Sequence, residues 1–253
     1  KRQEWSNAKH QKQWINTLKT YVFPTIGKMP LAWIEPHHVK QCLEPIWMSK
    51  KETSGRVRQR VEEIWDWAKA MGYVEGENPA RLRGNLKYLL PKQNKVVTHH
   101  PALDYNDLPD FWQQLRTIDG VTADALKLLI LTVGRNGEVR GATWKEIDWD
   151  LAVWIIPANK MKMRRPHRVP LCKTALDILH ERKRLTNSSY VFPGLRAEKS
   201  LSDGAMGKLI KTKFSNLTIV PHGFRSTFRD WAENQNFSHR ATEYCLAHTL
   251  KNK

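Results

Sequence analysis

The sequence predicts a mainly α-helical protein with a small antiparallel β-sheet, an α+β fold arranged in two domains. Apolar residues recur at helical spacing through the first third of the chain. The segment Leu89–Pro101 interrupts this periodicity with two prolines and mostly polar residues, and two short strand-like runs follow among further helices. We expect a helical domain at residues 1–88, a linker at 89–102 and a mixed domain at 103–253.

The first domain is expected to be helical. Apolar residues fall at helical spacing between Trp14 and Tyr21 and again between Val57 and Met71. Gly72 comes directly after the second run, in the place of a helix C-terminal cap.

The second domain mixes helices and strands. Residues 107–115 and 122–132 have helical spacing, residues 153–157 and 168–171 form the two arms of a β-hairpin, and helices return from Thr174. Most tryptophans are expected in the core because several lie in apolar periodic segments: Trp14, Trp65, Trp144 and Trp231.

The charge points to a polyanionic partner. Forty-two Lys and Arg residues against 25 Asp and Glu give a formal net charge of +17, and nucleic acid is the leading candidate. No apolar window approaches a spanning helix and no signal peptide opens the chain, so we expect a soluble cytoplasmic protein without a membrane partner. Cys42, Cys172 and Cys245 are widely spaced, which argues against disulfides and a zinc finger.

Arg135 is the first candidate site residue. It follows the apolar run Leu128–Leu131, so it would leave a buried helix at its C-terminal end, and Glu138 would open the next helix. A guanidinium held there suits phosphate because its planar fork donates two parallel hydrogen bonds. The same spacing also fits a partly buried ion pair between Arg135 and Glu138.

A cluster of basic residues lies between the two expected strands. This hairpin tip could reach along a nucleic-acid backbone, and a lysine there could donate a proton to a leaving oxygen. A solvated surface turn is the alternative. The cluster consists of Lys160, Lys162, Arg164 and Arg165.

Two histidines and a second arginine complete the candidate site. His222 and Arg225 lie three residues apart, so on a helix they share a face. His248 lies near a helix end, where a satisfied core or capping histidine is the ordinary explanation.

Three arginines open the helix that begins near residue 56. Arg56, Arg58 and Arg60 alternate with Val57 and Val61, so Arg56 and Arg60 would share an exposed stripe that could contact DNA. A basic face that is merely solvated is the alternative.

The order of these motifs resembles the tyrosine recombinases, in particular phage and genomic-island integrases, over essentially the whole chain. LTVGRNGEVRGATWKEIDW resembles the first arginine box of that family, IPANKMKMRRPHRVPL its lysine hairpin, and HGFRSTFRDWA with LAHTLKNK its second box. TLKTYVFPTIGKMP and RVRQRVEEIWDWAKAMGY resemble its helical core-binding domain.

The resemblance implies a site-specific recombinase that cuts and rejoins DNA through a 3′-phosphotyrosyl intermediate, without metal or other cofactor. Arg135 and Arg225 would clamp the phosphate, Lys162 would protonate the leaving 5′ oxygen, and His222 and His248 would bond the phosphate or move protons. Glu138 would support the site.

The implied partner is double-stranded DNA at the core of an attachment site, held in a C-shaped clamp, with a homotetramer forming on DNA when the protein is full length. The family places its tyrosine shortly after the last histidine, whereas Thr249–Lys253 contains none and Tyr244 is expected in the core. We therefore expect both ends to be trimmed, and this fragment to be a monomer inactive in cleavage.

Two other functions compete with recombination. A truncated integrase would bind DNA without cutting it. A metal-dependent nuclease would need clustered carboxylates, which Asp148, Asp150 and Asp230 do not form in the sequence.

Overall fold

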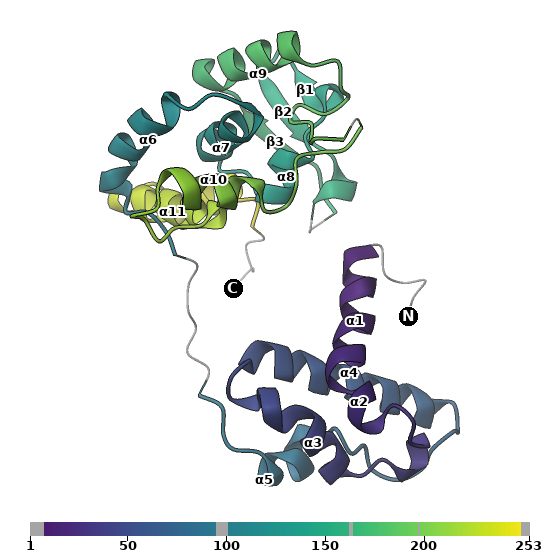
Figure 1. Ribbon diagram of the computed structural model, residues 1–253. Helices are drawn as coiled ribbons and strands as arrows, with labels where there is room; N and C mark the ends of the chain where they lie inside the picture. The colour runs from purple at the N-terminus through teal and green to yellow at the C-terminus, as the bar shows by residue number, and fades with distance from the viewer. Residues whose placement is uncertain (1–7, 95–100, 162–163, 197, 249–253) are drawn as a thin grey trace. The chain divides into compact units, whose positions relative to one another are not determined.

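The computed structural model describes residues 8–94, 101–161, 164–196 and 198–248. Residues 1–97 and 98–253 form two compact units (Figure 1), and each has its own hydrophobic core. The mainly helical fold with a small antiparallel sheet is confirmed.

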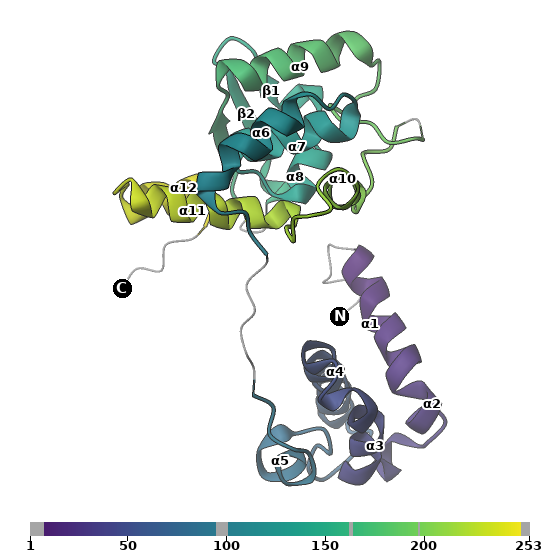
Figure 2. The same cartoon turned by 60° about the vertical axis from the view of Figure 1, so that its left-hand side comes forward.

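The first unit consists of helices and short turns. Its described elements are α1 (Ala8–Tyr21), α2 (Phe23–Ile26), the turn η2 (Leu31–Trp33), α3 (Pro36–Trp47), α4 (Lys51–Ala70), the kinked turn η3 (Leu82–Leu86) and α5 (Lys87–Leu89). Helix α3 packs on α4, and α1 contacts both α2 and α4 (Figure 2). Fully buried aliphatic side chains, among them Val39, Leu43 and Val57, fill the space between these helices.

Gly72 ends α4 as the sequence predicts. Its φ is +73°, a left-handed conformation that glycine adopts without steric cost. The N–H of Gly72 donates to the carbonyl of Lys69 at 3.0 Å, and that of Tyr73 donates to the carbonyl of Ala68 at 2.9 Å. These two bonds give a donor to carbonyls that would otherwise have no hydrogen-bond partner at the end of the helix.

In the second unit, helices and a small sheet share one hydrophobic core. Its described elements are η4 (Tyr105–Asp107), α6 (Leu108–Arg116), α7 (Val121–Thr132), α8 (Asn136–Arg140), η5 (Trp144–Glu146), β1 (Ile147–Asp148), β2 (Val153–Ile156), η6 (Ala158–Lys160), β3 (His167–Pro170), α9 (Lys173–Leu185), α10 (Ala205–Lys213), η7 (Pro221–Gly223), α11 (Phe224–Asn234) and α12 (His239–Cys245). The two helices expected at 107–115 and 122–132 are thereby confirmed.

The described strands form an antiparallel sheet in the order β1-β2-β3. The predicted hairpin is β2 and β3, in which Trp154 pairs with Val169 and Ile156 with His167. Trp154 and Ile156 are fully buried on the core face, as the period of two along a strand requires. Strand β1 was not predicted because two residues are too short to show any period.

Helix α7 is the centre of the second unit. It contacts α6, α8, α9 and α10 (Figure 1), and Leu126, Leu128 and Leu129 are buried on successive sides of it. Apolar side chains on several sides of a helix are expected where neighbouring helices pack against those sides. The C-terminal end of α7 is therefore held in place by the helices packed around it.

Gly223 allows the first described residues of this unit, Pro101 and Ala102, to lie in close contact with the turn that precedes α11. A Cβ at Gly223 would lie 2.2 Å from the carbonyl oxygen of Pro101 and 2.9 Å from the Cα of Ala102. The same contact is fixed by Val220 N–H, which donates to Pro101 O at 3.2 Å, and by Thr227 Oγ1, which donates to Leu103 O at 2.6 Å.

Of the three α4 arginines expected to contact DNA, Arg56 and Arg60 were predicted to form an exposed stripe, and this is wrong for Arg60. Arg60 is only 6% exposed and bonds the carbonyl of Gln13 at 3.0 Å and the hydroxyl of Thr17. Burial lowers the pKa of Arg60. Arg58 is paired with Glu62 at 2.6 Å and also donates to a backbone carbonyl. Of the three, only Arg56 is well exposed.

We expect Arg60→Ala to lower the stability of the first unit by about 1–3 kcal/mol, because it removes hydrogen bonds and packing between α1 and α4. Arg56→Ala removes the same charge from an exposed ion pair with Glu52 and should change stability by less than about 0.5 kcal/mol. Urea unfolding of the two variants measures both values, and equal effects would contradict the buried position of Arg60.

We expect Gly223→Ala to lower the stability of the second unit by about 1–3 kcal/mol, because the added methyl group would collide with backbone atoms. Gly207→Ala is the matched control. Gly207 lies inside α10, and a Cβ there would meet only Pro221 Cδ at 3.9 Å. Because alanine favours a helix more than glycine does, this variant should stabilise the second unit by up to about 1 kcal/mol. Thermal unfolding measures both variants. If both shifted the melting temperature in the same direction, the close contact between Gly223 and Pro101 would be ruled out.

Candidate functional site

Arg135 lies at the start of α8, directly beyond the end of α7. Glu138 accepts from it twice: the backbone N–H of Arg135 donates to Oε2 at 2.9 Å, and its guanidinium NH1 donates to Oε1 at 2.8 Å. Glu138 is buried. The partly buried ion pair that the sequence left open is therefore present, and it fixes the orientation of the Arg135 guanidinium.

Arg225 is the second residue of α11 and is only 5% exposed. Its NH1 donates to the carbonyl of Val133 at the end of α7, and its NH2 donates to the carbonyl of Leu246 at the end of α12. Three segments that are far apart in the sequence therefore meet at one guanidinium.

The two arginines converge on the chain that follows α12. Arg135 NH2 lies 3.3 Å from the carbonyl oxygen of Leu246 and 3.1 Å from that of Ala247, and it donates to both. Leu246 thus accepts from Arg135 and from Arg225. Ala247 has a φ of +47°, a left-handed conformation that is costly for a residue with a side chain.

Arg225 carries a charge that is only partly compensated. Burial, together with the nearby charge of Arg135, lowers the pKa of Arg225 to about 10, so the group remains protonated at neutral pH. Within the described residues, Arg135 pairs with Glu138 and Arg229 pairs with Glu243, but no carboxylate forms an ion pair with Arg225. The arrangement can accept an anion.

His248 lies against Arg225 and is held by Glu243. Its Nε2 is 3.2 Å from Arg225 NH2, and its Nδ1 is 2.8 Å from Glu243 Oε2. The other oxygen of Glu243 accepts from Arg229 NH2 at 2.8 Å. Sequence reasoning missed both Glu243 and Arg229. The spacing of Arg229 from Arg225, one helical turn along α11, was the available signal.

The predicted core position of Tyr244 is wrong, since its side chain is 65% exposed. Its ring lies edge-on to that of His167 on β3, with centroids 5.8 Å apart. Burial lowers the pKa of His167, and so does the nearby charge of Arg135. The charge of Glu138 raises the same pKa but does not outweigh them. His167, which the sequence did not single out, brings the end of the sheet to the site.

The other predicted residues of this unit are exposed, are paired elsewhere as Lys160 is, or lie outside the described residues. His222 is exposed in η7, three residues before Arg225. Lys162 lies outside the described residues. Lys160 is folded back onto Glu146 and the carbonyl of Gly141, whereas Arg164 and Arg165 are exposed.

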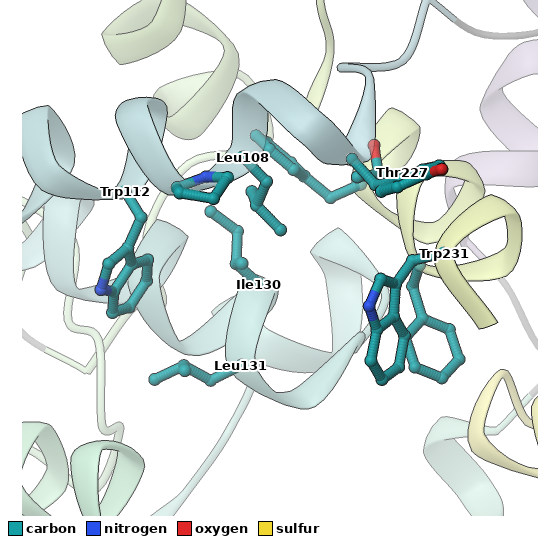
Figure 3. A pocket seen from close by; sticks show the side chains of 10 residues that line it. Leu108, Trp112, Ile130, Leu131, Thr227 and Trp231 are labelled. Atoms are coloured by element: carbon teal, nitrogen blue, oxygen red, sulfur yellow. The ribbon is translucent and has the colours of Figure 1, made fainter. Parts of the chain in front are cut away.

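An apolar pocket of about 460 Å³ lies on the other side of α11 (Figure 3). Helices α6, α7 and α11 supply its walls, with Trp112, Ile130 and Trp231 among the lining side chains. Trp231 is 40% exposed there, so its predicted core position is wrong. Helix α11 therefore has a basic side, with Arg225 and Arg229, and an apolar side.

Across the described ranges, no group of three or more His, Cys, Asp or Glu side chains is placed to hold a metal ion. In the same ranges, no helix combines the length and apolarity that a membrane span needs.

Comparison with known proteins covers both units. Residues 1–85 match the phage integrase central domain, and residues 102–253 match the phage integrase family. The chain is 28% identical to the integrase of Enterobacteria phage P4 and 31% identical to the prophage integrase IntZ of Escherichia coli (strain K12). Each alignment covers 98% of this chain but 60% of the relative, so the chain spans about three fifths of these curated relatives.

A solved structure shares the fold. The lambda integrase tetramer bound to a Holliday junction superimposes with a TM-score of 0.76 at 16% identity, covering 99% of this chain and 74% of that one. The arrangement of helices around a small sheet is thus that of an integrase.

We expect the stabilising effect of Glu243 to disappear in acid. Burial alone would raise the pKa of Glu243, but the hydrogen bond from His248 and the charge of Arg229 outweigh it and lower the pKa below the ordinary range. A carboxylate with a depressed pKa stabilises the fold above its unfolded-state pKa, and this contribution is lost as the pH falls through the folded-state value.

Glu243→Gln should therefore be less stable than the wild type at pH 7, and the difference should shrink as the pH falls below about 4.5. Urea unfolding at pH 7 and pH 3 measures this change. Glu233→Gln, the same substitution at an exposed position of α11, serves as the control. A difference that grows in acid would contradict the ion pair.

Proposed function

The chain belongs to the phage integrase family, and from that membership we propose that it is the DNA-recognising and catalytic part of a site-specific tyrosine recombinase. Such an enzyme would insert a mobile element into a chromosome in the bacterial cytoplasm. Residues 1–88 would form the core-type DNA-binding domain, 89–102 the linker and 103–253 the catalytic domain.

The charge on Arg225 is the observation that carries the proposal. A buried guanidinium with carbonyl partners and no ion-paired carboxylate among the described residues is favourable for an anion with several acceptor oxygens. Arg135 bonds the same carbonyl of Leu246, so a second guanidinium lies at the same place. A phosphodiester group is negatively charged and has two non-bridging oxygens, so each guanidinium can donate to one of them.

The proposed reaction is a pair of transesterifications. A tyrosine oxygen attacks the phosphorus, the bond to the 5′ oxygen breaks, and that oxygen takes a proton from Lys162. The product is a 3′-phosphotyrosyl ester and a free 5′ hydroxyl, and attack by the 5′ hydroxyl of another strand reverses the chemistry. The phosphodiester bond energy is conserved in the ester.

Each residue of the site has a proposed role. Arg135 and Arg225 would stabilise the charge that develops on the equatorial oxygens, because their guanidinium groups are fixed before the substrate arrives. His222 and His248 would bond the phosphate or move protons, and Glu138 would hold Arg135.

The proposed partner is double-stranded DNA at the core of an attachment site. Exposed Arg56, Arg164 and Arg165 would contact its backbone, with Lys160 reaching it if DNA displaces its contact with Glu146. The solved tetramer of lambda integrase on a Holliday junction supports a homotetramer on DNA for the full-length protein, with residues 1–253 alone expected to be a monomer.

Covalent capture tests the cleavage chemistry. A full-length polypeptide, meaning one that contains this sequence and spans the whole length of the relatives, should form a covalent adduct with nicked attachment-site DNA. Arg225→Ala should reduce the rate of adduct formation by about 100- to 1,000-fold, because it removes a preorganised donor to the transition state. Arg184→Ala removes the same charge from an exposed position on α9 and should cleave at the wild-type rate.

Unchanged cleavage by Arg225→Ala would refute the proposed site. The salt dependence of DNA binding by residues 1–253 provides a second measurement, since neutralising 6–10 phosphates should weaken binding by about 10³- to 10⁵-fold between 50 and 200 mM salt. DNA binding without any adduct from the full-length wild type would favour a non-catalytic DNA-binding protein.

A further inference from the structure

The end of α12 brings His248 back over the helix it follows. Ala247 adopts the left-handed conformation, and the two N–H groups of the turn donate backward: that of Ala247 to Tyr244 O and that of His248 to Glu243 O, both at 2.9 Å. This is the double hydrogen bond of a Schellman cap. It places His248 beside Glu243 although the two residues are five positions apart.

The side chains of these residues make a second bond. His248 Nδ1 is 2.8 Å from Glu243 Oε2. An ionised carboxylate can only accept hydrogen bonds, so Nδ1 must carry the proton and donate it. The opposite ring nitrogen, Nε2, lies 3.2 Å from Arg225 NH2, which can only donate. A neutral ring with its proton on Nδ1 satisfies both neighbours.

We propose that Glu243 is a positioning residue that holds His248 in its Nδ1-protonated form, so that Nε2 is the ring nitrogen presented to the phosphate and its reacting oxygens. This inference rests on the proposed function, because it assigns Glu243 a role in the same site. Glu243 does not itself meet the phosphate but acts through the imidazole, as carboxylates do when they orient a histidine.

Arg229 keeps Glu243 in its accepting form. Its NH2 donates to Glu243 Oε1 at 2.8 Å, so both carboxylate oxygens have partners. The charged groups that face the imidazole are Glu243 from α12 and Arg225 and Arg229 from α11. Arg229 NH2 also lies 3.2 Å from His248 Nδ1. Because both atoms bear protons, Glu243 is the group that binds Nδ1.

The consequence for the reaction is a defined path for one proton. With Nδ1–H bound to Glu243, Nε2 carries the ring's lone pair, which accepts from Arg225 NH2 in this structure. Once the phosphate takes that N–H, Nε2 can take a proton from a nucleophile or return it to one. The imidazolium that forms would donate at Nε2 to a phosphate oxygen, while the adjacent carboxylate offsets its new charge. Without Glu243, the imidazole ring could flip by 180°, or its proton could move from Nδ1 to Nε2. A proton on Nε2 would then face the N–H of Arg225, which also donates.

Nitrogen chemical shifts of the His248 ring test the contact without DNA. In ¹⁵N-labelled residues 1–253 with a neutral His248 ring, the wild type should show a protonated Nδ1 and an unprotonated Nε2. Glu243→Gln should lose this pattern and show a mixture of both neutral forms. Glu233→Gln should keep the wild-type pattern, since its side chain is exposed on α11.

Cleavage by the full-length polypeptide tests the role. Glu243→Gln should lower the single-turnover rate of adduct formation at saturating DNA by roughly 10- to 100-fold, the size of effect known for carboxylates that orient metal-bound histidines. Its dissociation constant for DNA should stay within about twofold of the wild-type value, whereas a merely structural defect would weaken binding as well. Glu233→Gln should match the wild type in both measurements.

Three results would overturn the proposal: a wild-type ring protonated on Nε2, an unaltered ring pattern in Glu243→Gln, or a wild-type cleavage rate in that variant. The first needs no variant, so the proposal is testable even if Glu243→Gln fails to fold. Failure of the proposed function is distinguishable. In that case the wild type forms no adduct, while its ring-nitrogen shifts still report whether Glu243 holds Nδ1.

Discussion

The candidate site depends on burying the charge of Arg225. Moving a guanidinium out of water costs several kcal/mol even after the protein relaxes, so the fold must supply hydrogen-bond acceptors for it. Carbonyl oxygens of Val133 and Leu246 do so. Carbonyls satisfy the N–H groups without cancelling the positive charge, which leaves the site able to bind an anion.

Backbone strain accompanies these acceptors. Val133 and Ala247 both have positive φ values, +53° and +47°, although each has a side chain. Each such conformation costs about 1–2 kcal/mol. The turns persist because their carbonyls bond the arginines and because the ends of α7 and α12 are held by packing. Rigid acceptors of this kind keep the two guanidinium groups in place before any ligand binds.

Much of the fold could be predicted from the sequence, because long periodic segments such as α6 and α7 bury one or more sides in a regular pattern. Arg60 could not be placed correctly in this way. Its contacts with Gln13 and Thr17 lie more than 40 residues away in the sequence, and an arginine in a helix gives no local sign that another helix covers it.

The candidate site was predictable only in part. The family resemblance named Arg135, Arg225 and His248, which the structure brings together. Their partners are harder to foresee, because every residue has a backbone carbonyl and nothing in the sequence marks those of Val133 and Leu246. Glu243 was missed for a related reason: its spacing of five from His248 is not a helical repeat, and only the left-handed turn at Ala247 joins them.

The distance along the chain between the acceptors of Arg225 has a consequence for biosynthesis. Val133 lies 92 residues before Arg225, and Leu246 lies 21 residues after it. A ribosome releases the chain from its amino end, so α7 can form and dock long before the second acceptor emerges. The Arg225 guanidinium lacks one of its two carbonyl acceptors until Leu246 has left the exit tunnel. A nascent chain can thus fold much of its core before Arg225 has both of its carbonyl acceptors.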